Sequence, residues 1–243
     1  MKVRRKIFIL GVNKTGTTSV ESALKVLGYK LTTFNPRLFR SLRKCSNLER
    51  LFEEAEYYDA CSDIPYFSYF RELDKKFPGS GFILTVRNPE DWYNSFRKFY
   101  HRWDLDFLEQ AIFRKSFRGE YQFFTDEAAV NLKSEFIRAM LDHNENVRRH
   151  FKGRPNDLKV IDLHQGEDPW VALCELTGSQ HPGIEFPNRN FRAQTLGQKL
   201  YYDFVRKHLV RLKMALMKTG LIPKNWSAYV AVQRFKIWLT RRS

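Results

Sequence analysis

The chain has 243 residues and is basic, with 42 lysines and arginines against 27 acids and a formal net charge of +15. This length allows one large α/β domain with a full hydrophobic core. The cysteines Cys45, Cys61 and Cys174 are odd in number and widely spaced, which argues against a disulfide framework and predicts reduced thiols. The first apolar run is too short to span a membrane, so we expect no signal peptide and a cytoplasmic protein.

The positive charge is concentrated at the two ends of the chain. Residues 1–44 hold eleven lysines and arginines and one acid, and residues 187–243 hold thirteen and one acid. Such a field favours anionic ligands or surfaces, although a generally basic surface would give the same count. The common nucleic-acid recognition motifs are missing from the sequence, so we expect no nucleic-acid partner.

The first strong pattern is a strand, a loop and a helix. An apolar run at 7–10 precedes a loop of glycine, lysine and hydroxyl residues, and the helix after it ends at Gly28. This arrangement is typical of an anion site built from backbone amides and a helix N-terminus. The alternative is a tight turn that needs its glycines only for geometry. The candidate ligands of a phosphate or sulfate are Lys14, Thr15, Gly16, Thr17 and Thr18.

The position of the lysine distinguishes this loop from a nucleotide-binding Walker A loop, G-x-x-x-x-G-K-[ST]. Gly11 and Gly16 have the Walker separation, but position 17 is threonine and the lysine is Lys14, inside the loop. This argues against an ordinary ATP or GTP hydrolase. The six histidines show no metal-ligand spacing, so we predict no metal.

Strand and helix patterns alternate along the rest of the chain. In the first half, the sequence predicts a short strand within 29–34, an irregular helix over 37–56, an extended segment at 57–63, a short helix over 66–76 and a central strand at 81–87. In the second half, it predicts a helix from Asn88-Pro89, a long helix from Thr125 to about His150, a strand at 158–163 and a helix over 170–176 closed by Gly178. The long helix should point Phe136, Ile137, Met140 and Leu141 inward. We expect a parallel central sheet with helices on both faces, a P-loop-like three-layer sandwich.

Ligands of such sheets bind at the carboxyl ends of the strands, where Lys14, Asp63 and Arg87 would meet. We expect one domain over 1–197 and basic helices over 198–243 packed on it. The last helix also has the pattern of a basic amphipathic helix lying on an anionic membrane. That alternative would place the protein peripherally at the inner membrane face.

Two segments, 11–18 and 84–95, resemble the signature regions of the sulfotransferase family. The first resembles its 5′-phosphosulfate loop. The second resembles its 3′-phosphate motif, in which an arginine is followed eight residues later by a serine, here Arg87 and Ser95. The resemblance covers residues 6–190 and implies transfer of a sulfuryl group from 3′-phosphoadenylyl sulfate (PAPS) to an acceptor hydroxyl, with 3′,5′-adenosine bisphosphate (PAP) as product. We expect a carbohydrate or glycolipid acceptor, selected by residues 35–60 and 100–125.

The resemblance also implies a catalytic base. Cytosolic members carry a histidine in an H-x-P segment a little over twenty residues before the arginine, and Asp63-Ile64-Pro65 stands there in this chain. We predict that Asp63 accepts the proton of the acceptor hydroxyl. The alternative is a loop carboxylate that caps the helix beginning near Pro65.

The sequence departs from the cytosolic members in two places. Ser19 stands where they often have an adenine-stacking tryptophan, and their R-K-G-x-x-G segment is missing. The nearest candidate is 186–192, in which Arg189 or Arg192 would contact the 3′-phosphate. Two other functions stay open, a P-loop small-molecule or nucleotide kinase that needs ATP and Mg²⁺, and a non-catalytic basic protein that binds polyanions.

Overall fold

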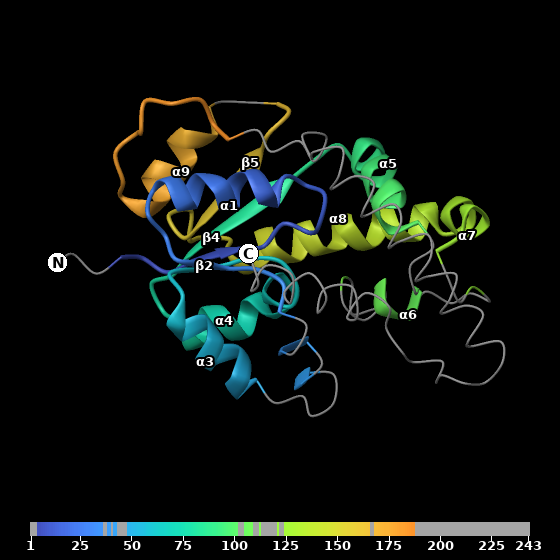
Figure 1. Ribbon diagram of the computed structural model, residues 1–243, viewed down its shortest axis with the longest axis horizontal. Helices are drawn as coiled ribbons and strands as arrows, with labels where there is room; N and C mark the ends of the chain where they lie inside the picture. The colour runs from blue at the N-terminus through green and yellow to red at the C-terminus, as the bar shows by residue number, and fades with distance from the viewer. Residues whose placement is uncertain are drawn as a thin grey trace, which may run out of the picture.

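The computed structural model describes residues 4–35, 38–39, 41–42, 48–101, 105–108, 112, 121, 124–165 and 168–187. In this part of the chain five strands form one sheet in the order β2-β3-β1-β4-β5 (Figure 1). The strands are β1 (Ile7–Ile9), β2 (Leu31–Thr32), β3 (Ala60–Cys61), β4 (Gly81–Val86) and β5 (Leu158–Asp162). Every neighbouring pair is parallel, so all the carboxyl ends lie at one edge, as predicted.

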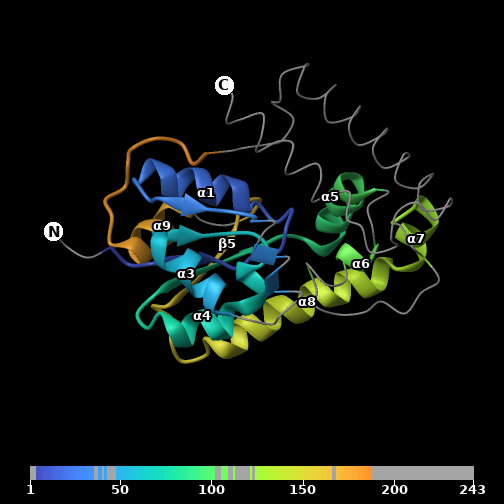
Figure 2. The same ribbon diagram turned by 60° about the horizontal axis from the view of Figure 1, so that its bottom comes forward.

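Helices cover both faces of the sheet, which confirms the predicted three-layer α/β fold. They are α1 (Thr17–Val26), α3 (Glu49–Tyr57), the short 3₁₀ helix η1 (Tyr66–Tyr69), α4 (Phe70–Lys76), α5 (Pro89–Tyr100), α6 (Leu105–Leu108), α7 (Asp126–Asn131), α8 (Lys133–His150) and α9 (Pro169–Thr177). Figures 1 and 2 show α1 and α9 on one face and α3, α4 and α8 on the other.

The apolar runs of the sequence fill both layers because successive strand residues point to opposite faces. In β1, Ile7 and Ile9 join the core under α1 and α9, whereas Phe8 joins the larger core on the other face. In β4, Ile83 and Phe82 divide in the same way. A run of consecutive apolar residues is therefore what a strand covered on both faces requires.

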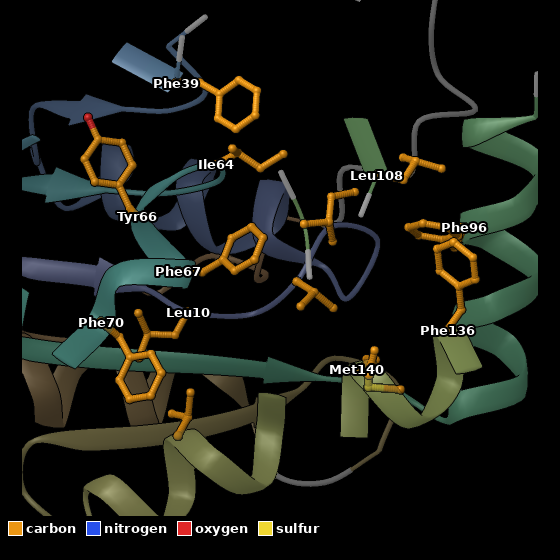
Figure 3. Packing of buried hydrophobic residues seen from close by; sticks show 14 of the residues in the cluster. Leu10, Phe39, Ile64, Tyr66, Phe67, Phe70, Phe96, Leu108, Phe136 and Met140 are labelled. Atoms are coloured by element: carbon orange, nitrogen blue, oxygen red, sulfur yellow. The ribbon is translucent and has the colours of Figure 1, made fainter. Parts of the chain in front are cut away.

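The larger core continues beyond the sheet to the place where α5 packs on α8 (Figure 3). The ring centroids of Phe96 and Phe136 are 5.2 Å apart, and those of Trp92 and Phe96 are 5.0 Å apart. Trp92 and Phe96 are completely buried. Both are therefore core residues.

Local signals correctly placed several helix ends. The side chain of Asn88 accepts from the amides of Glu90 and Asp91 and starts α5, with Pro89 in the first turn. Gly178 ends α9 in the left-handed conformation, with φ of 67°. These ends depend on residues within one turn, which is why the sequence alone identifies them.

The long helix expected from Thr125 to His150 is interrupted, which the sequence did not predict. Thr125 caps α7, but the backbone at Leu132 leaves the helical region and α8 begins after it. Leu141 was expected to point inward and is 45% exposed.

Several expectations fall partly or wholly outside the described residues. These are Cys45, the beginning of the irregular helix over 37–56, Arg189, Arg192 and the basic helices over 198–243. Cys61 and Cys174 are free thiols. Across the described ranges, no helix is both long enough and apolar enough to cross a membrane.

Candidate functional site

The loop between β1 and α1 is tied together by Thr15. The amide and hydroxyl of Thr15 both donate to the carbonyl of Val12, at 3.3 and 2.7 Å. The same hydroxyl oxygen lies 2.6 Å from that of Thr85 on β4. Thr15 is completely buried, so it shapes the loop and fastens it to the neighbouring strand.

Two glycines make this compact shape possible. A Cβ at Gly11 would lie only 1.8 Å from Oγ1 of Thr85 and 2.8 Å from its carbonyl oxygen, which no side chain can tolerate. Gly16 has φ of 105° and precedes α1. The glycines therefore have a geometric role, which is compatible with an anion site and does not by itself require one.

The N-terminus of α1 lacks the side-chain cap that α5, α7 and α9 have, as do the N-termini of α3, α4 and α8. Gly16 provides no side-chain cap, and the first turn of α1 contains no acid. By contrast, Asn88 caps α5 and Asp168 caps α9 through side-chain oxygens. Because the first amides of a helix have no helical acceptor, an uncapped N-terminus with buried hydroxyls is suited to an anion. Thr17 is buried beside these amides and Thr18 is exposed.

Lys14 has an unusual backbone and a partly desolvated side chain. Lys14 and Asp63 are the non-glycine residues in the described ranges with positive φ, at 75° and 69°. This conformation costs on the order of 1–3 kcal/mol and is common at functional sites. The Nζ atom of Lys14 lies 4.6 Å from the ring centroid of Phe99 on α5. Burial and then the charge of Arg87 lower the pKa of Lys14. A bound anion would offset both effects.

Arg87 follows β4 and contacts the loop directly. Its Nη1 donates to the carbonyl of Lys14 at 3.3 Å. Its Nε is buried and makes no hydrogen bond to any part of the chain that the structure describes. A buried guanidinium donor without an acceptor is costly unless a ligand accepts from it. Ser95 lies half-buried on α5, two turns beyond Asn88.

Asp63 lies at the end of β3, beside the same loop. Its Oδ1 accepts from Nδ2 of Asn13 and from the amide of Ile64, both at 2.7 Å. From the described residues, Oδ2 accepts no hydrogen bond. Burial raises the pKa of Asp63, although these two hydrogen bonds oppose the rise. Among the described residues, the carboxylate of Asp63 accepts from Asn13 and from the amide of Ile64 and from no amide of the helix after Pro65, so Asp63 does not cap that helix.

Asn13 connects the separate parts of the site, a role that no pattern in the sequence predicted. Its side chain donates to Asp63, and its carbonyl accepts from Nε1 of Trp92 at 2.9 Å. Residues 13 and 14 therefore contact Asp63 after β3, Arg87 after β4 and Trp92 on α5. The expected convergence of Lys14, Asp63 and Arg87 is confirmed.

Glu21 is a second carboxylate near this edge of the sheet, and no motif or periodic pattern in the sequence identified it. Its Oε1 accepts from the hydroxyl of Ser62 at 2.7 Å. In the sequence, its only sign was that it is the single acid among residues 1–44. Within the ranges described, no three His, Cys, Asp or Glu side chains gather as a potential metal site.

Comparison with known proteins bears on the family of the chain. A family model described as a sulfotransferase domain matches residues 6–195. The "Ava biosynthesis cluster protein M" of Aspergillus versicolor is 23% identical over 212 residues, which cover 75% of this chain and 80% of that protein. Among solved structures, a gluconokinase from Sinorhizobium meliloti 1021 gives a TM-score of 0.32 at 15% identity, covering 60% of this chain and 97% of the other. So low a structural score supports no conclusion about function.

Proposed function

The chain belongs to the sulfotransferase domain family, and on that premise we propose that it transfers a sulfuryl group from PAPS to a hydroxyl group of an acceptor. The observation that carries the proposal is the contact between Arg87 and Lys14. Nη1 of Arg87 lies 3.3 Å from the carbonyl oxygen of Lys14, so the two cationic residues are adjacent although they follow different strands. A donor with two anionic groups could be held by these two cations, which follow different strands and meet at one edge of the sheet.

The residues present fit such a donor. The uncapped N-terminus of α1 and Lys14 are suited to the phosphosulfate. Nε of Arg87, buried without an acceptor in the described structure, is suited to the 3′-phosphate. We assign Ser95, and Arg189 beyond the described residues, to the same phosphate as part of the proposal.

Bound PAPS would supply the sulfuryl group and its phosphate leaving group. During in-line displacement, one S–O bond forms to the acceptor while the S–O bond to the phosphate breaks. Lys14 and the amides and hydroxyls of Thr17 and Thr18 would stabilise the negative charge that grows on the leaving oxygen. Arg87 would hold the donor in line. Asp63 would accept the acceptor's proton on Oδ2, which has no donor in the described structure.

Carbohydrate and glycolipid hydroxyls are the acceptors we propose first. The Aspergillus relative is named for a biosynthesis cluster, so small hydroxylated metabolites belong in the same acceptor panel. Labelled PAPS, this panel and the purified chain test the function through PAP release and label transfer. We expect transfer to at least one acceptor and a large loss in Lys14→Ala and Asp63→Asn. Undiminished transfer in both variants would refute the assigned roles.

Thermal shift separates the proposal from the two alternatives. PAP should stabilise a sulfotransferase without added metal, because a ligand that binds only the folded state raises its melting temperature. ATP with Mg²⁺ should stabilise a kinase. A polyanion binder should respond to neither and should bind polyanions with steep salt dependence.

A further inference from the structure

Glu21 is a carboxylate at the site that the proposed reaction does not use. It lies on α1, one turn after Thr17, and its side chain is half-buried. Its Oε1 accepts from the hydroxyl of Ser62 at 2.7 Å. Because Ser62 directly precedes Asp63, this bond links the second turn of α1 to the segment that carries the proposed base.

Asp63 is thereby held from two sides. The loop reaches it through Asn13, whose Nδ2 donates to Oδ1 at 2.7 Å. On the other side, completely buried Ser62 is fixed to Glu21. We propose that Glu21 is a positioning residue for sulfuryl transfer, which holds the 62–63 segment through Ser62 and strengthens Asp63 as a base by its negative charge. This inference rests on the proposed function.

The electrostatics of the pair agree with this role. Burial raises the pKa of Glu21, the Ser62 hydrogen bond opposes that rise, the charge of Asp63 adds to it, and Lys25 on the same helix opposes it. Burial also raises the pKa of Asp63, against hydrogen bonds from Asn13 and the amide of Ile64. Since Coulomb repulsion between two charges is mutual, ionised Glu21 makes Asp63 hold a proton more strongly. Because the charge of Asp63 contributes to the raised pKa of Glu21, the proposal predicts that the two carboxyls titrate as a coupled pair.

Carboxyl NMR titration tests the coupling without donor or acceptor. In the ¹³C-labelled wild type we expect two coupled steps. Asp63→Asn should move the titration of Glu21 to lower pH, and Glu21→Gln should leave a single step for Asp63, below the upper step of the wild type. An unchanged Glu21 titration in Asp63→Asn would overturn the coupling, whatever reaction the protein catalyses.

The pH dependence of kcat tests the positioning role. Glu21→Gln should lower kcat about 3- to 10-fold, because a neighbouring charge changes basicity by about one pKa unit and the rate follows part of that change. The acid limb of the kcat–pH profile of Glu21→Gln should move to lower pH. Ser62→Ala keeps both carboxyls but removes the donor that lowers the pKa of Glu21. Glu21 then keeps its proton to higher pH and repels Asp63 less, so the acid limb should move to lower pH, by less than in Glu21→Gln.

Exposed Glu145 on α8 provides the control, since Glu145→Gln makes the same change in net charge away from the site. A purely structural role for Glu21 would lower the melting temperature without shifting the limb. NMR coupling together with an unmoved limb in both variants would therefore overturn the positioning role. If the wild type transfers a sulfuryl group to no acceptor, the proposed function is wrong, and the positioning role of Glu21 is wrong with it.

Discussion

Replacing Asp63 by asparagine should make the protein more stable and less active. Burial raises the pKa of Asp63 above its unfolded value, so the carboxyl favours folding only while protonated, and that contribution is lost as pH rises through the folded pKa. At neutral pH the buried charge destabilises the fold, and each unit of the pKa rise corresponds to about 1.4 kcal/mol. Asparagine carries no charge and tolerates the positive φ of 69° at this position.

The structure also predicts that asparagine keeps the local hydrogen bonds. Its Oδ1 can accept from Asn13 and from the amide of Ile64, as Oδ1 of Asp63 does. We therefore expect Asp63→Asn to be more stable than the wild type at pH 7, and each 1 kcal/mol gained would raise the melting temperature by about 2–4 °C for a chain of this size. The gain should shrink towards acid pH. Because the amide cannot accept a proton, kcat should fall by about 10²- to 10⁴-fold.

The assay combines thermal melts from pH 4 to pH 8 with kcat at saturating PAPS, for the wild type, Asp63→Asn and the control Glu145→Gln. The control should match the wild type in both measurements. Two results would refute the reasoning. One is a variant less stable than the wild type at every pH, which would mean that the carboxylate stabilises the fold. The other is a kcat within about threefold of the wild type, far short of the loss expected for a base.

Three further substitutions test the loop and its neighbours. Arg87→Lys keeps the charge but loses the planar fork, so initial rates should show KM for PAPS about tenfold higher; an unchanged KM would remove Arg87 from the donor site. Gly11→Ala forces a Cβ to within 1.8 Å of Thr85 Oγ1 and should cost about 1–3 kcal/mol or more in urea unfolding; wild-type stability would contradict the tight packing. Phe99→Leu removes the ring that Nζ of Lys14 contacts, and such a cation–π contact contributes about 0.5–1 kcal/mol. We therefore expect kcat to fall about two- to fivefold in Phe99→Leu and to stay near the wild type in Phe99→Tyr. Equal losses in both variants would argue against the cation–π contact.

Signals contained within one turn or one strand were sufficient for most of the fold. The cap at Asn88 and the left-handed Gly178 mark helix ends because their hydrogen bonds close locally. The apolar run at 81–86 identified the central strand because both of its faces are covered. The parallel arrangement then brought Lys14, Asp63 and Arg87 to one edge without any side-chain information.

The contacts that organise the site could not be predicted, because they join residues far apart in the chain. Ser62 donates to Glu21 across 41 positions. His143 on α8 lies with Nε2 at 2.7 Å from the carbonyl oxygen of Leu10, across 133 positions. Neither pair belongs to a motif or to a periodic pattern. The break at Leu132 is similar, since a continuous apolar periodicity gave no sign of it.

The site divides its charges between two sides of one loop, and this division explains its unusual residues. Lys14 and Arg87 repel one another on the side assigned to the donor, where a bound anion would relieve the repulsion. Glu21 and Asp63 repel one another on the side assigned to the base, where a proton from the acceptor would relieve it. Asn13 lies between the two pairs and is neutral, so it can contact Asp63 without cancelling its charge. A bound anion would relieve the first repulsion and a transferred proton the second, so donor binding and proton transfer would both be favoured by the charges of the site. That is the arrangement by which a binding site favours the transition state over the resting state.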